Sequence, residues 1–491
     1  MLETFGWHRL RAVRGPIEHH WRVFTVVGAA VAMASMDGGM IPILFQDIQA
    51  SFPDTPSTTL SWVFTAYTIG LAAFVVASGR LADRTGRRRM FLIGVVTFVV
   101  GSALCALAPS AGVLIAARFV EGTGHALFTP ASLGLILAAW PVERRTAAIA
   151  AWIAIGGIAA GIGPTVGALF VQFGDWRGAF CLNIVIGVPV LWRARRVLAR
   201  TEPQADARIP DVVGIALLTV SLGLLAMVIV QGRTWGWTDP KIVGGAVMCV
   251  LLGTAFAWRS AHHPAPVLDV ALLRRHTYRL SLIVSTLVTI SMMANLVMQA
   301  QFLRQAWDYS PLKAGLAVTP LPVLAGITAP FAGRLAGRYG HRTIILVGIA
   351  MSALGLFAYG LLPDETPNYF TEFLPGMVLA GIGTWGLAIS MINAAAVTDM
   401  NTDNFGVGTA VLQTARQTGG ILGVSLFFGF FGTPAVSEVA GTFTHLWLWF
   451  AILPTIGFLL ALGFPAELGR SAPATRPASA PPISPATARG T

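Results

Sequence analysis

Long apolar runs recur along this chain and are separated by short polar segments. Each run is close to the roughly 20 residues that an α-helix needs to cross the hydrocarbon core of a bilayer. Because lipid satisfies no backbone polar group, isolated spanning segments must be helical. The pattern predicts fourteen membrane-spanning helices at 23–45, 60–79, 90–108, 111–135, 146–171, 178–192, 211–231, 242–258, 280–302, 312–332, 343–362, 372–398, 405–431 and 442–464.

Composition supports this assignment to an all-α integral membrane protein. The 491 residues are 55% hydrophobic and only 11% charged, whereas soluble domains carry about 25% charged residues. So few charges cannot cover a water-soluble protein of this length. The net charge of +11 does not indicate nucleic-acid binding, because the basic residues lie in short loops between apolar runs.

The distribution of basic residues orients the helices. With a cytoplasmic N-terminus, 26 of the 33 Arg and Lys residues fall in cytoplasmic segments and five fall in outer loops. The other two, Arg118 and Arg416, lie inside spans. This bias follows the positive-inside rule and predicts that both termini are cytoplasmic. Because only Lys241 and Lys313 are lysines, the Arg-rich composition favours a bacterial protein, and hence the inner (plasma) membrane.

An internal repeat divides the chain. The segment Gly79–Arg88 recurs as Gly333–Arg342 with seven of ten positions identical, and each copy follows the second span of a six-span block. Two related halves around a central site are a common transporter design. We therefore expect a cytoplasmic N-terminal segment at 1–22 and a first six-helix bundle at 23–196. An inserted helix pair at 211–258 leads to a second six-helix bundle at 280–464, and a disordered cytoplasmic tail follows at 470–491.

Several motifs resemble those of the major facilitator superfamily, and specifically its 14-span drug:proton antiporter subgroup. They are the 79–90 loop, Arg118-Phe119-Val120-Glu121-Gly122-Thr123-Gly124, the 161–167 motif, Trp176-Arg177 with Asn183 and Gly187, and Tyr309-Ser310-Pro311. The resemblance implies the major facilitator fold of two six-helix bundles plus two inserted helices. It also implies alternating-access export of amphipathic small molecules, such as drugs or secondary metabolites, in exchange for protons.

Two of these motifs carry implied roles. By resemblance, the first loop braces the cytoplasmic gate through Gly79, Asp83, Arg84, Gly86, Arg87 and Arg88. The motif of Gly161, Gly163, Pro164 and Gly167 marks exporters in this family. Three departures stand out: Gly337 replaces the acid of the second loop copy, Ala159 and Ala168 stand at usual glycine positions, and Glu121 stands where glutamine is common.

Ionisable residues inside spans are the main candidates for proton coupling. Asp37 lies about 21 Å along its helix from Val23, past the membrane midplane, where an acid costs about 2.5–3.5 kcal/mol on insertion scales. Arg118, Glu121 and His125 share one face of the 111–135 helix. Arg118 lies about 10 Å along that helix from Ala111, near the depth of Asp37. The alternatives are a solvated acid at the outer helix end, a local Arg118–Glu121 pair, and a histidine that only packs.

A substrate cavity is expected between the bundles. Span 280–302 corresponds by the repeat to the first span, and its polar and methionine side chains suit a loose organic-molecule site. Ordinary packing or lipid-facing methionines are nearly as good an explanation. Arg416 could bind cargo, join the two halves or pair with an acid. The expected cavity residues are Asp37, Met292, Asn295, Met298, Gln299, Asn393 and Arg416.

These features predict a secondary active transporter and not an enzyme. The alternatives are a proton-coupled uptake symporter for a small nutrient and, less favoured, a membrane-embedded sensor. We expect no catalytic residues, no metal and no cofactor, with the proton gradient as the driving force. The expected partners are a small organic substrate, protons and the lipid bilayer, with no nucleic acid, and the protein is expected to be a monomer.

Overall fold

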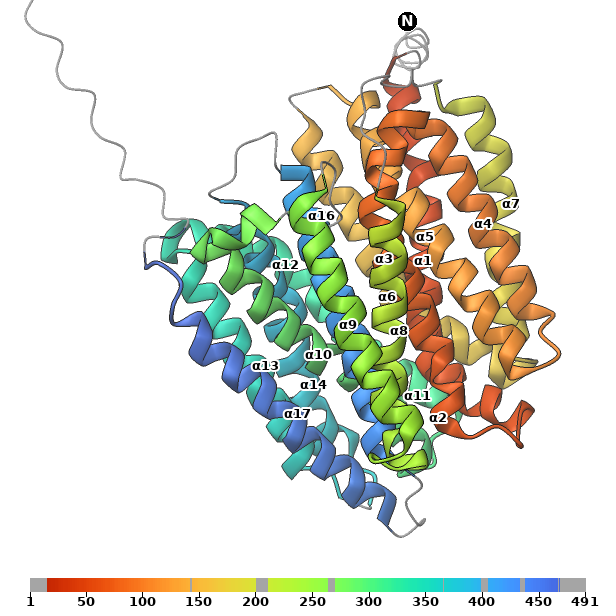
Figure 1. Cartoon of the computed structure of the whole chain (residues 1–491), viewed down its shortest axis with the longest axis vertical. Helices are drawn as coiled ribbons and strands as arrows, with labels where there is room; N and C mark the ends of the chain where they lie inside the picture. Colours follow the sequence, from red (N-terminus) through yellow and green to blue (C-terminus); the bar gives the residue numbers. More distant parts are fainter. Residues whose placement is uncertain are drawn as a thin grey trace, which may run out of the picture.

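The computed structural model describes residues 16–141, 144–199, 211–263, 270–364, 366–398, 405–432, 438–466 and 468. The described chain is almost entirely helical, and Figure 1 shows long helices standing side by side. The predicted tail at 470–491 and most of the predicted segment at 1–22 lie outside these residues.

The N-terminal helices form one bundle, drawn from red to yellow in Figure 1. In this bundle α1 packs on α6 and α7, α4 packs on α5 and α7, and α3 packs on α5. The short helix α2 (Ser57–Leu60) leads into α3. The long helices are α1 (Pro16–Ser51), α3 (Trp62–Thr85), α4 (Arg87–Ala106), α5 (Ala111–Ala139), α6 (Arg145–Phe173) and α7 (Arg177–Val197).

The C-terminal helices form the second bundle, in which α10 packs on α16 and α17. A short 3₁₀ helix at Val270–Arg274 precedes it, and two π-helical stretches, Tyr369–Phe373 and Gly381–Ala388, flank α14. Its helices are α10 (His276–Gln305), α11 (Pro311–Val318), α12 (Pro320–Tyr339), α13 (His341–Leu361), α14 (Leu374–Ala380), α15 (Ile389–Val397), α16 (Phe405–Phe431) and α17 (Val439–Ala461).

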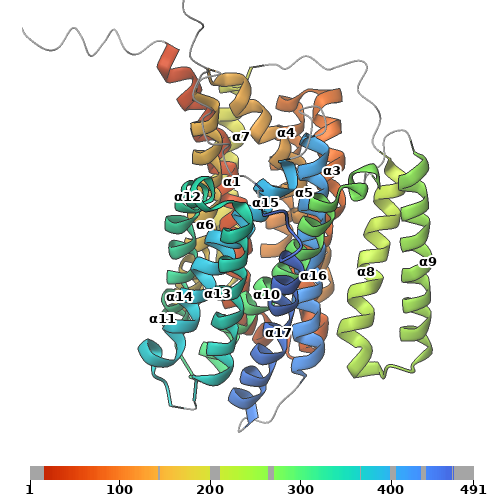
Figure 2. The same ribbon diagram turned by 90° about the vertical axis from the view of Figure 1, so that its left-hand side faces the viewer.

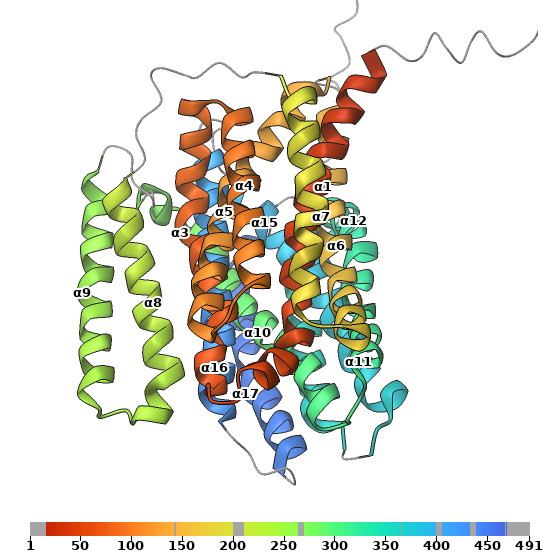
Figure 3. The same cartoon turned by 90° about the vertical axis from the view of Figure 1, so that its right-hand side faces the viewer.

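The inserted pair, α8 (Val212–Trp235) and α9 (Pro240–His262), stands at the edge of the molecule (Figures 2 and 3). Helix α8 contacts α3 and α16, whereas α9 packs mainly on α8. At one end of the pair Asp211 accepts a hydrogen bond from the backbone N–H of Gly214 at 2.9 Å and forms an ion pair with Arg259 of α9 at 2.7 Å. This pair caps α8 and ties the two helices together.

The all-α membrane fold is confirmed, but the count of fourteen spans is not. Within the described residues, twelve helical segments are long and apolar enough to cross a membrane. Helices α5 and α16 occupy the positions of the other two predicted spans but are not among the twelve. They are the helices that carry Arg118 and Arg416, whose charges lower their hydropathy. The count of fourteen and the domain boundaries therefore stay predictions.

Helices α1 and α6 approach so closely that side chains are excluded from their contact. A Cβ atom on Gly39 of α1 would lie 2.5 Å from the carbonyl oxygen of Ala160, and one on Gly163 of α6 would lie 2.5 Å from that of Met36. Because these neighbours are backbone atoms, they cannot yield without a shift of the helix. The Gly163-Pro164 motif thus fixes α6 against the part of α1 that carries Asp37.

This packing makes a substitution test possible within one helix. We expect Gly163→Ala to destabilise the protein by about 1–3 kcal/mol through overpacking and to lower its thermal midpoint in detergent. Gly157→Ala in the same helix is the matched control, because a Cβ atom there would meet nothing within 4 Å. Equal melting midpoints for the two variants would contradict the close α1–α6 contact.

Candidate functional site

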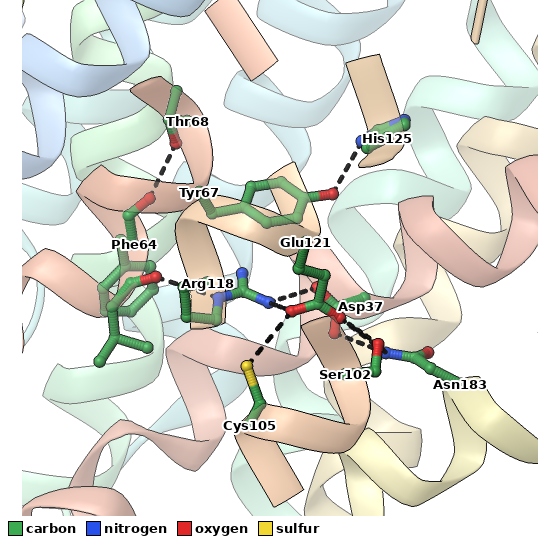
Figure 4. A network of polar contacts seen from close by, with 11 residues as sticks. Asp37, Phe64, Tyr67, Thr68, Ser102, Cys105, Arg118, Glu121, His125 and Asn183 are labelled. Carbon is green, nitrogen blue, oxygen red and sulfur yellow. Dashed lines mark hydrogen bonds and ion pairs between the residues drawn. The ribbon is translucent and has the colours of Figure 1, made fainter. Parts of the chain in front are cut away.

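A buried ion cluster lies inside the N-terminal bundle (Figure 4). Arg118 of α5 donates through Nη1 to Asp37 Oδ2 of α1 at 2.7 Å and to Glu121 Oε2 at 2.6 Å, and its Nε donates to the Val63 carbonyl at 3.1 Å. Asp37 and Arg118 are 1% exposed and Glu121 is 0% exposed. Arg118 therefore pairs both with Asp37 on another helix and with Glu121 on its own helix, the two partners that the sequence left as alternatives.

Neutral donors complete the cluster. Ser102 of α4 donates to Glu121 Oε1. Asn183 Nδ2 of α7 lies 2.9 Å from Asp37 Oδ1 and 3.2 Å from Glu121 Oε1. Asn183 thus bridges the two carboxylates from the side opposite Arg118 (Figure 4). Sequence reasoning noted Asn183 only as a motif residue and did not single out Ser102.

The cluster has one more acidic group than basic groups, so it can bind one proton. Two carboxylates, on Asp37 and Glu121, face one guanidinium, on Arg118. With both carboxylates ionised, the cluster would hold one uncompensated negative charge away from water, which is expensive. One bound proton makes it neutral. The arrangement can therefore take up and release a proton between two states that differ by one charge.

His125 reaches this cluster only indirectly. Its Nδ1 lies 2.7 Å from the hydroxyl of Tyr67 on α3, and the Tyr67 ring lies 4.2 Å from Arg118 Cζ. His125 does not contact either carboxylate in the structure, although it shares a helix face with Arg118 and Glu121. Tyr67 was missed from the sequence, because a single tyrosine in an apolar run carries no signal of its partner.

The expected cavity side chains of α10 lie largely inside their own bundle. Asn295 accepts a hydrogen bond from Trp447 Nε1 at 2.9 Å, and Gln299 Nε2 donates to the Tyr359 hydroxyl at 2.9 Å. Met292 and Met298 are 5% and 0% exposed. Asn393 on α15 is part-buried. Their contact with a substrate stays a prediction.

The repeated loop contains the same backbone turn in both halves. Gly86 joins α3 to α4 with φ of 93°, and Gly340 joins α12 to α13 with φ of 86°. Positive φ strains residues that have a Cβ atom, which explains why both copies keep this glycine. The turn is therefore part of the repeated scaffold.

The charged residues of the first copy make contacts within the N-terminal bundle. Arg87 pairs with Asp83 at 3.4 Å and donates to the Gly134 carbonyl of α5 at 3.3 Å, and Arg88 donates to the Arg195 carbonyl of α7. Arg84 is exposed. A role of Asp83 in bracing the gate against the second bundle stays a prediction.

The two bundles meet through polar contacts near one end, which the positive-inside orientation makes the outer end. Arg304 of α10 forms an ion pair with Asp47 of α1 and donates to the Ile43 carbonyl at 3.0 Å. Thr165 of α6 lies 2.7 Å from the hydroxyl of Thr319, which follows α11. These contacts join the two bundles at that end.

Paired helical bundles with a dry ionisable cluster in one of them define a secondary-transporter architecture. A family model described as Major Facilitator Superfamily matches residues 27–424 and 280–488. The chain therefore belongs to the major facilitator superfamily.

Curated relatives and solved structures agree with this assignment. The chain is similar to the multidrug resistance protein Stp of Mycobacterium tuberculosis, with 32% identity over 406 residues that cover 81% of this chain and 73% of that protein. It is 28% identical to the tetracenomycin C resistance and export protein of Streptomyces glaucescens, over 92% of this chain and 83% of that protein. These relatives confirm the predicted family and its drug-efflux subgroup, and with them a transporter and not an enzyme.

The fold also matches a solved structure of the xylose transporter XylE from E. coli in a partially occluded inward open conformation. The TM-score is 0.62 at 14% identity, covering 91% of this chain and 98% of that one. At this identity the match supports the fold alone.

The buried cluster makes a quantitative prediction about stability. Replacing Arg118 by Gln leaves two buried carboxylates without a cation and should cost about 3–5 kcal/mol. Adding Asp37→Asn and Glu121→Gln to the same variant should restore most of this loss, because no buried charge then remains. The measurement is the thermal midpoint of the purified protein in detergent.

The control for this series is Arg84→Gln, at an exposed arginine near the end of α3, where a surface substitution should change stability by no more than about 0.5 kcal/mol. If the triple variant melts as low as Arg118→Gln alone, charge imbalance is not the cause of the loss.

Proposed function

We propose that this protein exports amphipathic small molecules, drugs or secondary metabolites, in exchange for protons by alternating access. The observation that carries the proposal is the buried cluster with two carboxylates and one guanidinium. Such a cluster can store one proton at membrane depth, as proton antiport requires. The names of the curated relatives, which include resistance and export proteins, support export over uptake.

Proton binding would act on the conformation through Arg118. With both carboxylates charged, Arg118 is held between Asp37 on α1 and Glu121 on its own helix. Protonation of Asp37 weakens the link between α1 and α5 and leaves the local pair in α5. A ligand or proton shifts a conformational equilibrium only by its differential interaction with the two states, and this change in pairing supplies such a difference.

In this proposal the protein lies in a bacterial inner membrane with both termini cytoplasmic, and the proton gradient drives it without a bound cofactor. With the bundles joined at the outer end, cargo would load from the cytoplasm in this state. Release requires the Asp47–Arg304 and Thr165–Thr319 contacts to break while the cytoplasmic end closes. The Asp83 loop and the α10 side chains are the parts proposed to serve gating and cargo contact.

The proton role of Asp37 can be tested in everted membrane vesicles. A compound to which the gene confers resistance is added to energised vesicles, and release of lumenal protons is followed with a pH-sensitive dye. We expect Asp37→Asn to abolish compound-induced proton release, because an amide cannot exchange a proton, while the protein remains folded. Asp54→Asn, at an exposed loop acid, is the control and should behave as wild type. Wild-type proton release by Asp37→Asn would refute the proposed site.

The outer closure gives a second prediction. Arg304→Gln removes the ion pair with Asp47 and should increase the population with an open outer end. Spin labels at Asp54 and Thr371, in a variant in which Cys181 and Cys249 are serine, report the distance between the outer ends of the bundles. We expect a longer distance component in Arg304→Gln. Lys313→Gln is the matched control, because Lys313 lies over the Tyr309 ring of its own bundle at 3.6 Å; an identical change in both variants would count against a latch.

A further inference from the structure

Arg416 lies near the middle of α16, on the face that is turned toward the other bundle. It is eleven residues from Phe405, or about 16 Å along the helix. One turn later, a Cβ atom on Gly420 would lie 3.3 Å from Met293 of α10 and 3.7 Å from Thr68 of α3 in the N-terminal bundle. Since residues i and i+4 share a helix face, Arg416 belongs to the same inter-bundle surface.

Arg416 differs from Arg118 in how its charge is balanced. The structure gives Arg416 no hydrogen-bond or ion-pair partner among the described residues, and its Nε is buried and unsatisfied. Arg118, by contrast, contacts two carboxylates and a backbone carbonyl. Each arginine lies deep in one of the two bundles, but only the one in the N-terminal bundle is neutralised.

No spare carboxylate is available to Arg416 in the described part of the chain. Asp37 and Glu121 are the described acids in the middle of spanning helices, and both are bound to Arg118. The other described acids lie in loops or within the end turns of helices. An unpaired arginine at membrane depth is costly and is a functional site by default. None of the described acids can therefore supply its counter-charge.

We propose that the cargo carries an acidic group, a carboxylate or an ionised phenol, and that Arg416 is its binding partner. This inference rests on the proposed export function and names the chemical class of its substrate. Arg416 is part-buried, so its side chain is not wholly enclosed by the described residues. Its guanidinium can bind a carboxylate with two parallel hydrogen bonds.

The neighbours of Arg416 suit the rest of such a molecule. Gln413, three residues before it, shares its helix face, and Gln417 Oε1 lies 4.0 Å from the Cβ position of Gly420. Both glutamines are part-buried and offer neutral hydrogen-bonding groups. Met293, opposite Gly420, provides an adaptable apolar contact. Together they form a surface with one fixed cation, two amides and a flexible apolar side chain, which matches an amphipathic organic acid.

The direction of transport is consistent with this charge. A bacterial inner membrane is negative inside, so the potential drives an anion outward and a proton inward. Exchange of an anionic cargo for a proton therefore uses the membrane potential in both half-reactions. A cationic cargo would have to leave against it.

Binding is tested first, with two xanthene dyes of opposite charge. Fluorescein is anionic and rhodamine 6G is cationic, and their anisotropy reports binding to the purified full chain. We expect wild type to bind fluorescein at least 10-fold more tightly than rhodamine 6G. Arg416→Gln should weaken fluorescein binding by about 10-fold to 100-fold, the range for one charged hydrogen bond, and leave rhodamine 6G unchanged.

Matched variants separate a binding role from a structural one. Arg416→Lys keeps the charge and should retain most of the fluorescein affinity, Arg416→Glu should reverse the dye preference, and Lys313→Gln should not change it. Tighter binding of rhodamine 6G by wild type, absence of fluorescein binding, or an equal loss of both dyes in Arg416→Gln would overturn the proposal.

Transport is measured separately, as fluorescein uptake into everted vesicles with an imposed pH gradient. Uptake that requires the gradient and is lost in Arg416→Gln supports both proposals. If fluorescein binds through Arg416 but its uptake ignores the gradient, the acidic-cargo site stands and the proton-exchange function fails. If uptake is gradient-driven but Arg416→Gln transports fluorescein as wild type does, the function stands and the site fails.

Discussion

The structure of the N-terminal bundle depends on neutralising one arginine away from water. Arg118 cannot lie at the centre of the bundle unless carboxylates from α1 and α5 meet it there. Ser102 and Asn183 then hold these carboxylates from α4 and α7, and the Val63 carbonyl of α3 accepts from the guanidinium. Five helices are thereby tied to one point. A change of protonation at this point is felt by most of the bundle, which is what a coupling site needs.

Close helix packing is what keeps this point dry. A Cβ atom on Gly101 of α4 would lie 2.7 Å from the backbone nitrogen of Glu121, and one on Gly122 of α5 would lie 2.0 Å from the Tyr67 carbonyl. With glycine at these positions, α3, α4 and α5 pack backbone to backbone around the charges, as small residues allow in membrane helices. Low water content strengthens every charge interaction in the cluster. The charged cluster therefore depends on the glycines that pack the helices around it.

The sequence predicts the features of this cluster that depend on depth in the membrane. It misses those that depend on the rotation of each helix about its own axis. Hydropathy places the spans, and distance along each helix brings Asp37 and Arg118 to the same level. It does not show that Asn183 turns inward, because the rotation of α7 is set by its neighbours. The same limit affected α10, where helical spacing correctly groups Asn295 and Gln299. Spacing alone could not show that this face meets Trp447 and Tyr359 of its own bundle.

The two bundles share a scaffold and have diverged in charge. Both keep the glycine turn at Gly86 and Gly340, because the backbone there needs positive φ in either half. The acid at Asp83 has become Gly337 in the second copy, and a Cβ atom there would meet nothing within 4 Å, so no packing requirement explains the loss. The N-terminal bundle holds one more membrane-depth carboxylate than arginines, and the described C-terminal bundle holds an arginine and no such carboxylate. The extra carboxylate of the N-terminal bundle attracts a proton, and the arginine of the C-terminal bundle attracts an anion. In the proposed exchange, this division of charge gives the proton and the anionic cargo separate binding sites, so neither site competes for the other's ion.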